Sequence, residues 1–262
     1  MSNPMMAKVI ENFFRKVLPV DRYAFGKICR SNGLQLDYHY NKEGINVLDE
    51  IFVQRVYAPY FPFYEKATII DVGAHFGYFS LFAALNTSSD SRILALEPSP
   101  GNFERLQKNL SKHPFKNIEV HALGLAGSSA ERSLYGGPSF NHSLFDHAGA
   151  TNQQTTVPTL SLADLLAQQT LQTIDFLKLD CEGAEYPILL ESPVEVLTRI
   201  KVISMEFHDL QKEGYQPQQL IRHLESTGFD IRQYSFSPTY GTKASNYGKI
   251  VAVRAGKDLN SH

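Results

Sequence analysis

The chain has 262 residues, of which 43% are hydrophobic and 20% are charged, and its formal net charge is −2 at pH 7. This composition excludes a disordered or fibrous chain and predicts one globular domain with a modest extension. The small net charge gives no electrostatic reason to expect a nucleic-acid or anionic-membrane partner.

The sequence also favours a cytoplasmic protein. Cys29 and Cys181 are the only cysteines and lie far apart, which fits a reducing compartment. The first 20 residues are interrupted by charges, unlike a secretory signal. No apolar run approaches the roughly 18 residues of a membrane span, so we expect none.

The first 62 residues predict an N-terminal helical cap. Residues 5–18 carry apolar side chains at helical spacing, and Pro19 ends that pattern. We favour a helix packed on the main domain; a membrane-surface helix or a dimer contact is the alternative, so a homodimer stays open. An aromatic cluster near the end of the cap is expected to be core more than a platform for a sugar ring: Tyr57, Tyr60, Phe61 and Phe63.

Residues 63–262 predict an α/β domain with a mostly parallel sheet. Short apolar runs at 68–73, 91–98, 117–124, 174–183 and 200–208 alternate with helical patterns at 79–86, 101–113, 161–169 and 216–228. Residues 229–238 and 247–255 predict an antiparallel pair at the sheet edge. Residues 126–156 are polar and Gly-rich, and we expect a long functional or mobile loop there.

Acidic residues end four of the predicted strands. They are Asp71, Glu97, Asp180 with Glu182, and Glu206. The carboxyl ends of parallel strands meet at one edge of the sheet, where ligands bind. A single acid at a strand end could simply cap a helix or lie in a loop. Carboxylates at four strand ends together predict a binding site.

The first strand is followed by a glycine turn that fits a ligand without phosphates. Gly73 and Gly77 let a ligand lie against the backbone. A dinucleotide fingerprint would also need glycines at positions 75 and 78, which are His75 and Tyr78. Glu97 can accept the hydroxyl protons of a ribose, and the surrounding carboxylates would attract the ammonium and sulfonium of S-adenosylmethionine.

Four motifs resemble one known family. DVGAHFGYFSLFAA, ALEPSPGNFERLQKNL, LKLDCEGAE and SMEFH, in this order and spacing, are similar to the FkbM family of S-adenosylmethionine-dependent methyltransferases over about residues 51–208. The resemblance implies a Rossmann-like class I methyltransferase fold, with seven strands in the order 3-2-1-4-5-7-6 and helices on both faces. It also implies O-methylation of a sugar, glycan or small natural product, with S-adenosylhomocysteine as the second product.

The resemblance further assigns roles to residues. It implies that the turn from Asp71 through Gly73, Ala74, His75 and Phe76 to Gly77 holds the methionine half of the cofactor. Glu97 would hold the ribose, Pro98 and Ser99 would border the adenine, and Ala122, Leu123 and Gly124 would cover its other side. Asp180 would face the methionine and the reacting centre. His75 departs from the Asn or Gly that is common in such turns.

Methyl transfer to a hydroxyl needs a base near the sheet edge. His208 is the preferred base by its unperturbed pKa, although a histidine that bonds a loop is equally consistent. Glu182 is the second choice, because neighbouring carboxylates raise the pKa of one of them. Lys178 joins Asp180, Glu182 and His208 in the predicted catalytic set, as an ion-pair partner. Since Lys178 supplies positive charge, we expect no metal, although this set could also hold a divalent ion.

The acceptor is the least defined part of the prediction. We expect it to be bound by Asn141, His142, Ser143 and Glu206, although residues 141–143 also suit a solvated loop. A nitrogen or carbon acceptor stays open. Two other functions are also open: an NAD-dependent oxidoreductase, disfavoured by His75 and Tyr78, and a non-catalytic scaffold that binds an adenosyl ligand.

Overall fold

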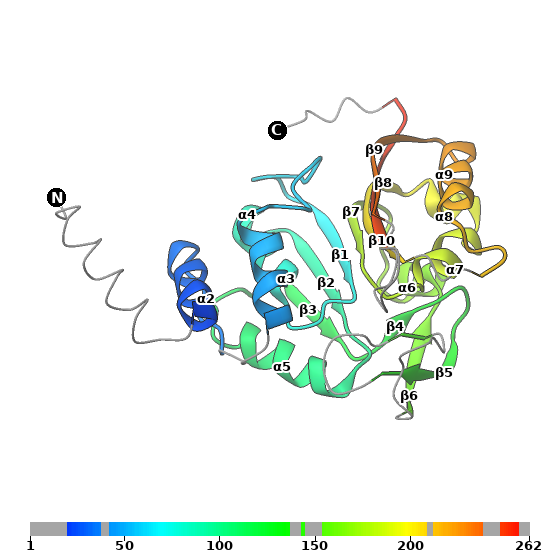
Figure 1. Cartoon of the computed structure of the whole chain (residues 1–262). Coiled ribbons are helices and arrows are strands. Elements are labelled where there is room, and N and C mark those ends of the chain that lie inside the picture. The colour runs from blue at the N-terminus through cyan, green and yellow to red at the C-terminus, as the bar shows by residue number, and fades with distance from the viewer. Residues whose placement is uncertain are drawn as a thin grey trace.

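The computed structural model describes residues 20–37, 42–136, 143–144, 154–208, 212–237 and 247–256. These residues form a large sheet with helices on both faces and a smaller sheet beside it (Figure 1). The helix predicted over residues 5–18 lies outside the described residues. No described helix combines the length and the apolar character needed to cross a membrane.

The large sheet has the predicted seven strands in the predicted order. The strands are β1 (Thr68–Val72), β2 (Arg92–Leu96), β3 (Ile118–His121), β7 (Ile174–Leu179), β8 (Ile200–His208), β9 (Phe229–Ser237) and β10 (Tyr247–Arg254). Their order is β3-β2-β1-β7-β8-β10-β9, which confirms 3-2-1-4-5-7-6 for this set. Strand β10 runs antiparallel to both neighbours, and the other pairings are parallel. The strand order changes direction between β1 and β7, so a ligand is expected to bind at the carboxyl ends of these two strands.

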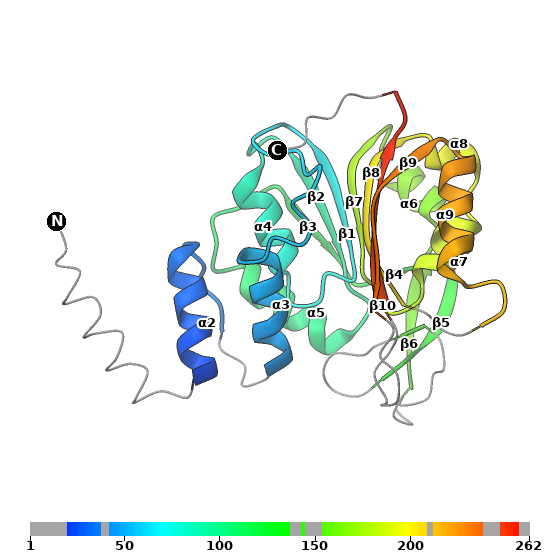
Figure 2. The same cartoon turned by 45° about the horizontal axis from the view of Figure 1, so that its top comes forward.

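Helices cover both faces of the sheet (Figure 2). One face carries α2 (Val20–Ser31), α3 (Lys42–Phe52), α4 (Tyr78–Asn86) and α5 (Pro100–Leu110), and the other carries α6 (Leu162–Gln168), α7 (Glu185–Leu190), α8 (Val194–Leu197) and α9 (Pro217–Ser226). Helix α6 is capped by Ser161, whose Oγ accepts a hydrogen bond from Asp164 N (3.0 Å).

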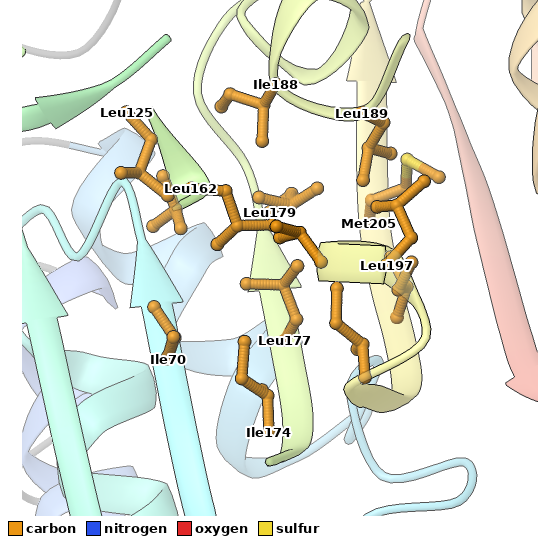
Figure 3. Packing of buried hydrophobic residues seen from close by; sticks show 14 of the residues in the cluster. Ile70, Leu125, Leu162, Ile174, Leu177, Leu179, Ile188, Leu189, Leu197 and Met205 are labelled. Carbon is orange, nitrogen blue, oxygen red and sulfur yellow. The ribbon is translucent and has the colours of Figure 1, made fainter. Parts of the chain in front are cut away.

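Each face of the sheet has its own core, because side chains alternate along a strand. Ile70 and Leu177 point into the core beneath α6–α9, together with Leu125 and Met205 (Figure 3). Their neighbours Ile69 and Phe176 point the other way, toward α4. In that second core Phe61 makes edge contacts with the rings of Phe79, Phe82 and Phe176, as expected for a core aromatic residue.

The cap shares its core with the main domain. Phe25 and Ile28 of α2 and Leu48 and Ile51 of α3 belong to the same buried cluster as Phe82 of α4. Burial of these apolar side chains therefore fixes α3 against the rest of the fold. The boundary between residues 62 and 63 stays a prediction.

The prediction of one long loop over residues 126–156 is wrong in part, because some of these residues form a second sheet. Strands β4 (Gly124–Leu125), β6 (Gln154–Leu160) and β5 (Ala130–Tyr135) pair in the order β4-β6-β5. The sheet was missed because its strands carry few apolar residues; Val157 and Leu134 are buried, and their neighbours in sequence are exposed or half-buried. It places Leu125 and Leu134 beside the edge of the large sheet where the ligand is expected.

Candidate active site

A cavity of about 330 Å³ opens at the carboxyl ends of β1, β2, β7 and β8. The sheet contributes the strand-end residues, α3 and Tyr57 form one wall, and the small sheet forms another. Ten predicted site residues line the cavity: Gly73, Ala74, His75, Glu97, Pro98, Gly124, Lys178, Asp180, Glu182 and Glu206. Those outside the lining are Asp71, Phe76, Gly77, Ser99, Ala122, Leu123, Ser143 and His208, while Asn141 and His142 lie outside the described residues.

The glycine turn holds the ends of β1, β2 and β7 together. Gly73 has a φ of 73°, and a Cβ there would lie 1.9 Å from the backbone oxygen of Asp180. The backbone N–H groups of Gly73 and Ala74 donate to Leu96 O at 3.1 and 3.0 Å. From α5, Asn109 Nδ2 donates to Phe76 O at 2.9 Å. Gly73 is therefore required by close approach of the two strand ends as well as by its left-handed backbone conformation.

Asp71 supports the turn from behind the cavity. It is fully buried, accepts a hydrogen bond from Ser80 Oγ (2.7 Å) and forms an ion pair with Lys178 Nζ (3.1 Å). Lys178 Nζ also donates to the backbone oxygens of Val72 (3.2 Å) and Gly73 (2.8 Å). Burial acts to lower the pKa of Lys178, but the charges of Asp71 and Asp180 outweigh it and hold the pKa above its usual value. Lys178 is thus a cation that positions the turn, and its contact with Asp71 agrees with the ion-pair role expected for it.

Glu97 is the buried acid at the end of β2. Its Oε1 accepts from Ser99 N (2.9 Å), its Oε2 accepts from His75 N (2.8 Å), and the side chain of Asn102 donates to the same carboxylate. Burial raises the pKa of Glu97 to about 7, although these donors act to lower it. A carboxylate has about four acceptor positions, so roughly one is left for a ligand hydroxyl. Asn102 also lines the cavity; the sequence prediction missed it inside the motif ALEPSPGNFERLQKNL.

The wall next to Glu97 contains some of the residues predicted for it. Pro98 lines the cavity as expected, whereas Ala122 is exposed and Leu123 half-buried. Gly124 lines the cavity as predicted, and it is joined there by Leu125; both lie on strand β4. A Cβ on Gly124 would touch Thr159 at 3.5 Å and Pro98 at 3.6 Å, so the wall is closely packed there.

Three carboxylates converge at the other end of the cavity. Asp180, Glu182 and Glu206 all line it, as predicted for the carboxyl edge of β7 and β8. Burial and the neighbouring charge of Asp180 raise the pKa of Glu206 to about 8. Lys249 on β10 lies 3.8 Å from Glu206 Oε2 and lowers that pKa in part.

His208 lies behind these carboxylates, and the structure revises its expected role. Its Nε2 is 3.4 Å from Glu182 Oε2 and 3.7 Å from Glu206 Oε1, and its Nδ1 is 3.4 Å from Glu185 Oε1. Burial acts to lower the pKa of His208, but attraction to the Glu185 and Glu182 carboxylates raises it to about 10. An imidazole that is already protonated at neutral pH cannot accept a proton.

Glu185 is a site residue that the sequence prediction passed over. It is fully buried on α7 and accepts hydrogen bonds from Cys181 N and Gly183 N, both at 2.8 Å. These bonds hold the turn after β7, in which Glu182 adopts a positive φ of 54°. Its place as the last residue of the motif LKLDCEGAE was the available signal.

Ser143 supports the same turn. It is 1% exposed, and its Oγ donates to the backbone oxygen of Glu182 at 2.6 Å. Its neighbour Leu144 lines the cavity, so this part of the chain reaches the site as expected. The Ser143 hydroxyl is bonded to the protein backbone, whereas the sequence predicted that it would contact the methyl-accepting substrate.

Among the described residues, Asp180, Glu206 and His208 offer possible metal-ligand atoms within 4.8 Å of one another. A metal would need the lone pair of a neutral imidazole. The expectation that no metal binds here stays a prediction, because a bound metal would itself compete with the proton for that lone pair.

Comparison with known proteins establishes the family. The sequence model of the Methyltransferase FkbM domain matches residues 71–231. This chain belongs to the FkbM methyltransferase family. The matched range contains the glycine turn and all the carboxylates at the strand ends, and it leaves α2, α3 and Tyr57 outside.

Individual proteins also resemble this FkbM methyltransferase. Methyltransferase 1 of Beauveria bassiana is 29% identical over 202 residues, which cover 70% of this chain and 79% of the relative. The hexuronic acid methyltransferase AglP of Haloferax volcanii is 26% identical over 160 residues, 61% of this chain and 62% of the relative. Among solved structures, M. capricolum TrmK in complex with S-adenosyl-homocysteine is 13% identical, with 77% of this chain and 67% of that chain covered and a TM-score of 0.45.

Proposed function

We propose that this protein transfers a methyl group from S-adenosylmethionine to a hydroxyl of a sugar, glycan or small natural product. One observation carries the proposal: a single cavity has a buried acid for a ribose at one end and converging carboxylates at the other. The hexuronic acid methyltransferase relative supports a sugar-like acceptor. The match to methyltransferases leaves the oxidoreductase interpretation without support.

The chemistry of the lining fits this cofactor. Lys178 is the one Lys or Arg among the described lining residues, and its charge is already paired with Asp71. A pyrophosphate would therefore meet carboxylates without a free cation, whereas an ammonium and a sulfonium would be attracted. We expect Glu97 and Asn102 to share the two ribose hydroxyls, and Pro98, Gly124 and Leu125 to enclose the adenine. When bound, S-adenosylmethionine supplies an electrophilic methyl group for in-line displacement.

Glu206 is the base that we propose. Its pKa of about 8 lies near a working pH, where a general base is most effective. It lines the cavity, so its carboxylate can take the proton of an acceptor hydroxyl. The His208 cation, 3.7 Å from Glu206 Oε1, stabilises the ionised form of that carboxylate. Asp180 would face the positively charged methionine half.

A transfer assay tests the chemistry. S-adenosylmethionine with a labelled methyl group is incubated with neutral sugars, sugar acids and hydroxylated natural products, with Asp180→Asn as the inactive control. We expect an oxygen-linked methyl group in a product, identified by mass spectrometry. Transfer to nitrogen or carbon would overturn O-methylation. Cofactor binding without transfer to any acceptor would favour a scaffold.

The homodimer that the sequence leaves open and the expected cytoplasmic location rest on sequence features alone. The apolar stripe that would form a dimer contact lies outside the described residues. Light scattering coupled to size-exclusion chromatography tests the first, and microscopy of a tagged chain tests the second. A strictly monomeric protein, or one found outside the cytoplasm, would reject the corresponding expectation.

A further inference from the structure

Tyr57 brings the N-terminal cap into the candidate active site. It lies outside residues 71–231, which match the family, and it lines the cavity. Helix α3 ends at Phe52, and Val56 N then donates to Glu50 O at 3.0 Å. The chain therefore folds back beneath the end of α3, and this return places Tyr57 at the sheet edge.

The ring of Tyr57 is held on several sides. It is 6% exposed and meets the ring of Phe79 edge-on, with centroids 5.2 Å apart and an interplanar angle of 70°. Lys178 Nζ and Lys249 Nζ lie 5.8 and 5.9 Å from its centroid, within reach of a cation–π attraction. A buried ring with these neighbours has little freedom to turn.

This fixed ring directs its hydroxyl group at Asp180. Tyr57 Oη donates to Asp180 Oδ2 at 3.1 Å. Burial and the charge of Asp180 raise the pKa of Tyr57 well above 10, so the hydroxyl keeps its proton and stays a donor. A carboxylate has about four acceptor positions, so this bond uses one of them and others remain for a ligand.

We propose that Tyr57 is a positioning residue, whose hydroxyl fixes the Asp180 carboxylate in the orientation that receives the positively charged methionine half of the cofactor. This inference rests on the function proposed above, which places that half of the cofactor against Asp180. The N-terminal cap would then take a direct part in cofactor binding. Helix α3 forms a wall of the cavity, and Tyr57, which follows α3 in the chain, orients Asp180.

Calorimetric titration with two ligands tests the inference without any acceptor. S-adenosylhomocysteine contains the amino-acid half, whereas 5′-methylthioadenosine lacks it. We expect Tyr57→Phe to weaken S-adenosylhomocysteine binding about tenfold and to leave 5′-methylthioadenosine binding within about twofold, because one hydrogen bond to a charged group is lost. Tyr64→Phe, on a side chain that is 83% exposed, is the matched control and should change neither affinity.

A double-mutant cycle identifies the partner through which Tyr57 acts. Asp180→Asn should weaken the same ligand selectively, and Tyr57→Phe added to it should cost little more, since both changes remove one interaction. Equal weakening of both ligands would mean that Tyr57 only shapes the cavity, and unchanged S-adenosylhomocysteine binding would mean that it positions nothing. Either result overturns the inference while leaving the proposed function intact. Failure of the unmodified protein to bind S-adenosylhomocysteine would overturn both.

Discussion

Lys178 and Asp71 stand opposite each other on neighbouring strands and form a buried ion pair. They are partners in the register of β7 and β1, and their side chains are 4% and 0% exposed. The Lys178 ammonium reaches past Asp71 to the backbone oxygens of Val72 and Gly73. The pair therefore ties the central strands to the turn that forms the floor of the cavity.

Removal of one partner should be strongly destabilising. Lys178→Met leaves Asp71 buried without its counter-ion, and we expect a loss of about 3–5 kcal/mol in the free energy of unfolding, measured with urea. The double variant Asp71→Asn/Lys178→Met should recover part of that loss. Lys201→Met, which removes a half-exposed ion pair with Asp175, is the control and should cost less than about 1 kcal/mol. Equal losses for the two lysines would contradict this role.

Gly73→Ala should destabilise the protein for two reasons: the new Cβ collides with the backbone at the end of β7, and the positive φ is strained for alanine. The new Cβ would lie 1.9 Å from Asp180 O, so β1 and β7 would have to separate. We expect a loss of about 3–5 kcal/mol from the overpacking and the positive φ together. Gly33→Ala isolates the strain, because Gly33 has a φ of 67° with nothing within 4 Å, and it should cost about 1–2 kcal/mol. The same urea measurement would contradict this explanation if the two variants lost equal stability.

The stability of the ligand-free protein should fall as the pH rises. The pKa values of Glu97, Glu206 and His208 are about 7, 8 and 10 in the folded state, above the ordinary 4.5, 4.5 and 6.5. A group with a raised folded pKa holds its proton more tightly when folded, so its contribution is complete below the unfolded pKa and is lost as the pH rises through the folded value. We therefore expect Tm to decline from about pH 5 to about pH 10.

Glu97→Gln separates one part of that decline. The variant should remove the fall between the ordinary pKa of 4.5 and the folded value of about 7, and should leave the fall due to Glu206 and His208. The exposed Glu104→Gln is the control and should keep the full decline. Scanning calorimetry at constant ionic strength measures both. A Tm that rises over this range in the unmodified protein would contradict the buried, proton-holding site.

Glu206→Gln should remove the base. With the acceptor identified by the transfer assay, we expect kcat to fall about 10²–10⁴-fold while S-adenosylhomocysteine still binds. In the unmodified enzyme, kcat should rise with pH through about 8, as Glu206 becomes ionised. Glu195→Gln, on the exposed surface of α8, should leave kcat unchanged. If His208→Asn abolished transfer while Glu206→Gln kept it, His208 would regain the role of base.

The strand order and the acids at the strand ends were predictable because they follow from local patterns. Buried apolar runs such as residues 68–73 identify strands, and the acid after each run falls at the same edge of a parallel sheet. The small sheet was not predictable in this way, since β5 and β6 are mostly polar and contain no continuous apolar run.

The features of the site that the sequence did not predict depend on contacts between residues far apart in the chain. Tyr57 and Asp180 are 123 residues apart, so sequence patterns give no sign that their side chains meet. His208 has the ordinary pKa of a base until Glu185 and Glu182 are placed around it. Glu97 was predicted as a ribose ligand, but the donors that already occupy it come from the backbone of His75 and Ser99, which only the folded turn brings near.

Calorimetric titration of the purified protein with S-adenosylmethionine, S-adenosylhomocysteine and NADH tests the central claim most directly. We predict micromolar binding of both adenosyl ligands, no binding of NADH, and loss of binding in Glu97→Ala with the fold intact by circular dichroism. Binding of NADH alone, or adenosyl binding that survives Glu97→Ala unchanged, would contradict the assignment of this cavity.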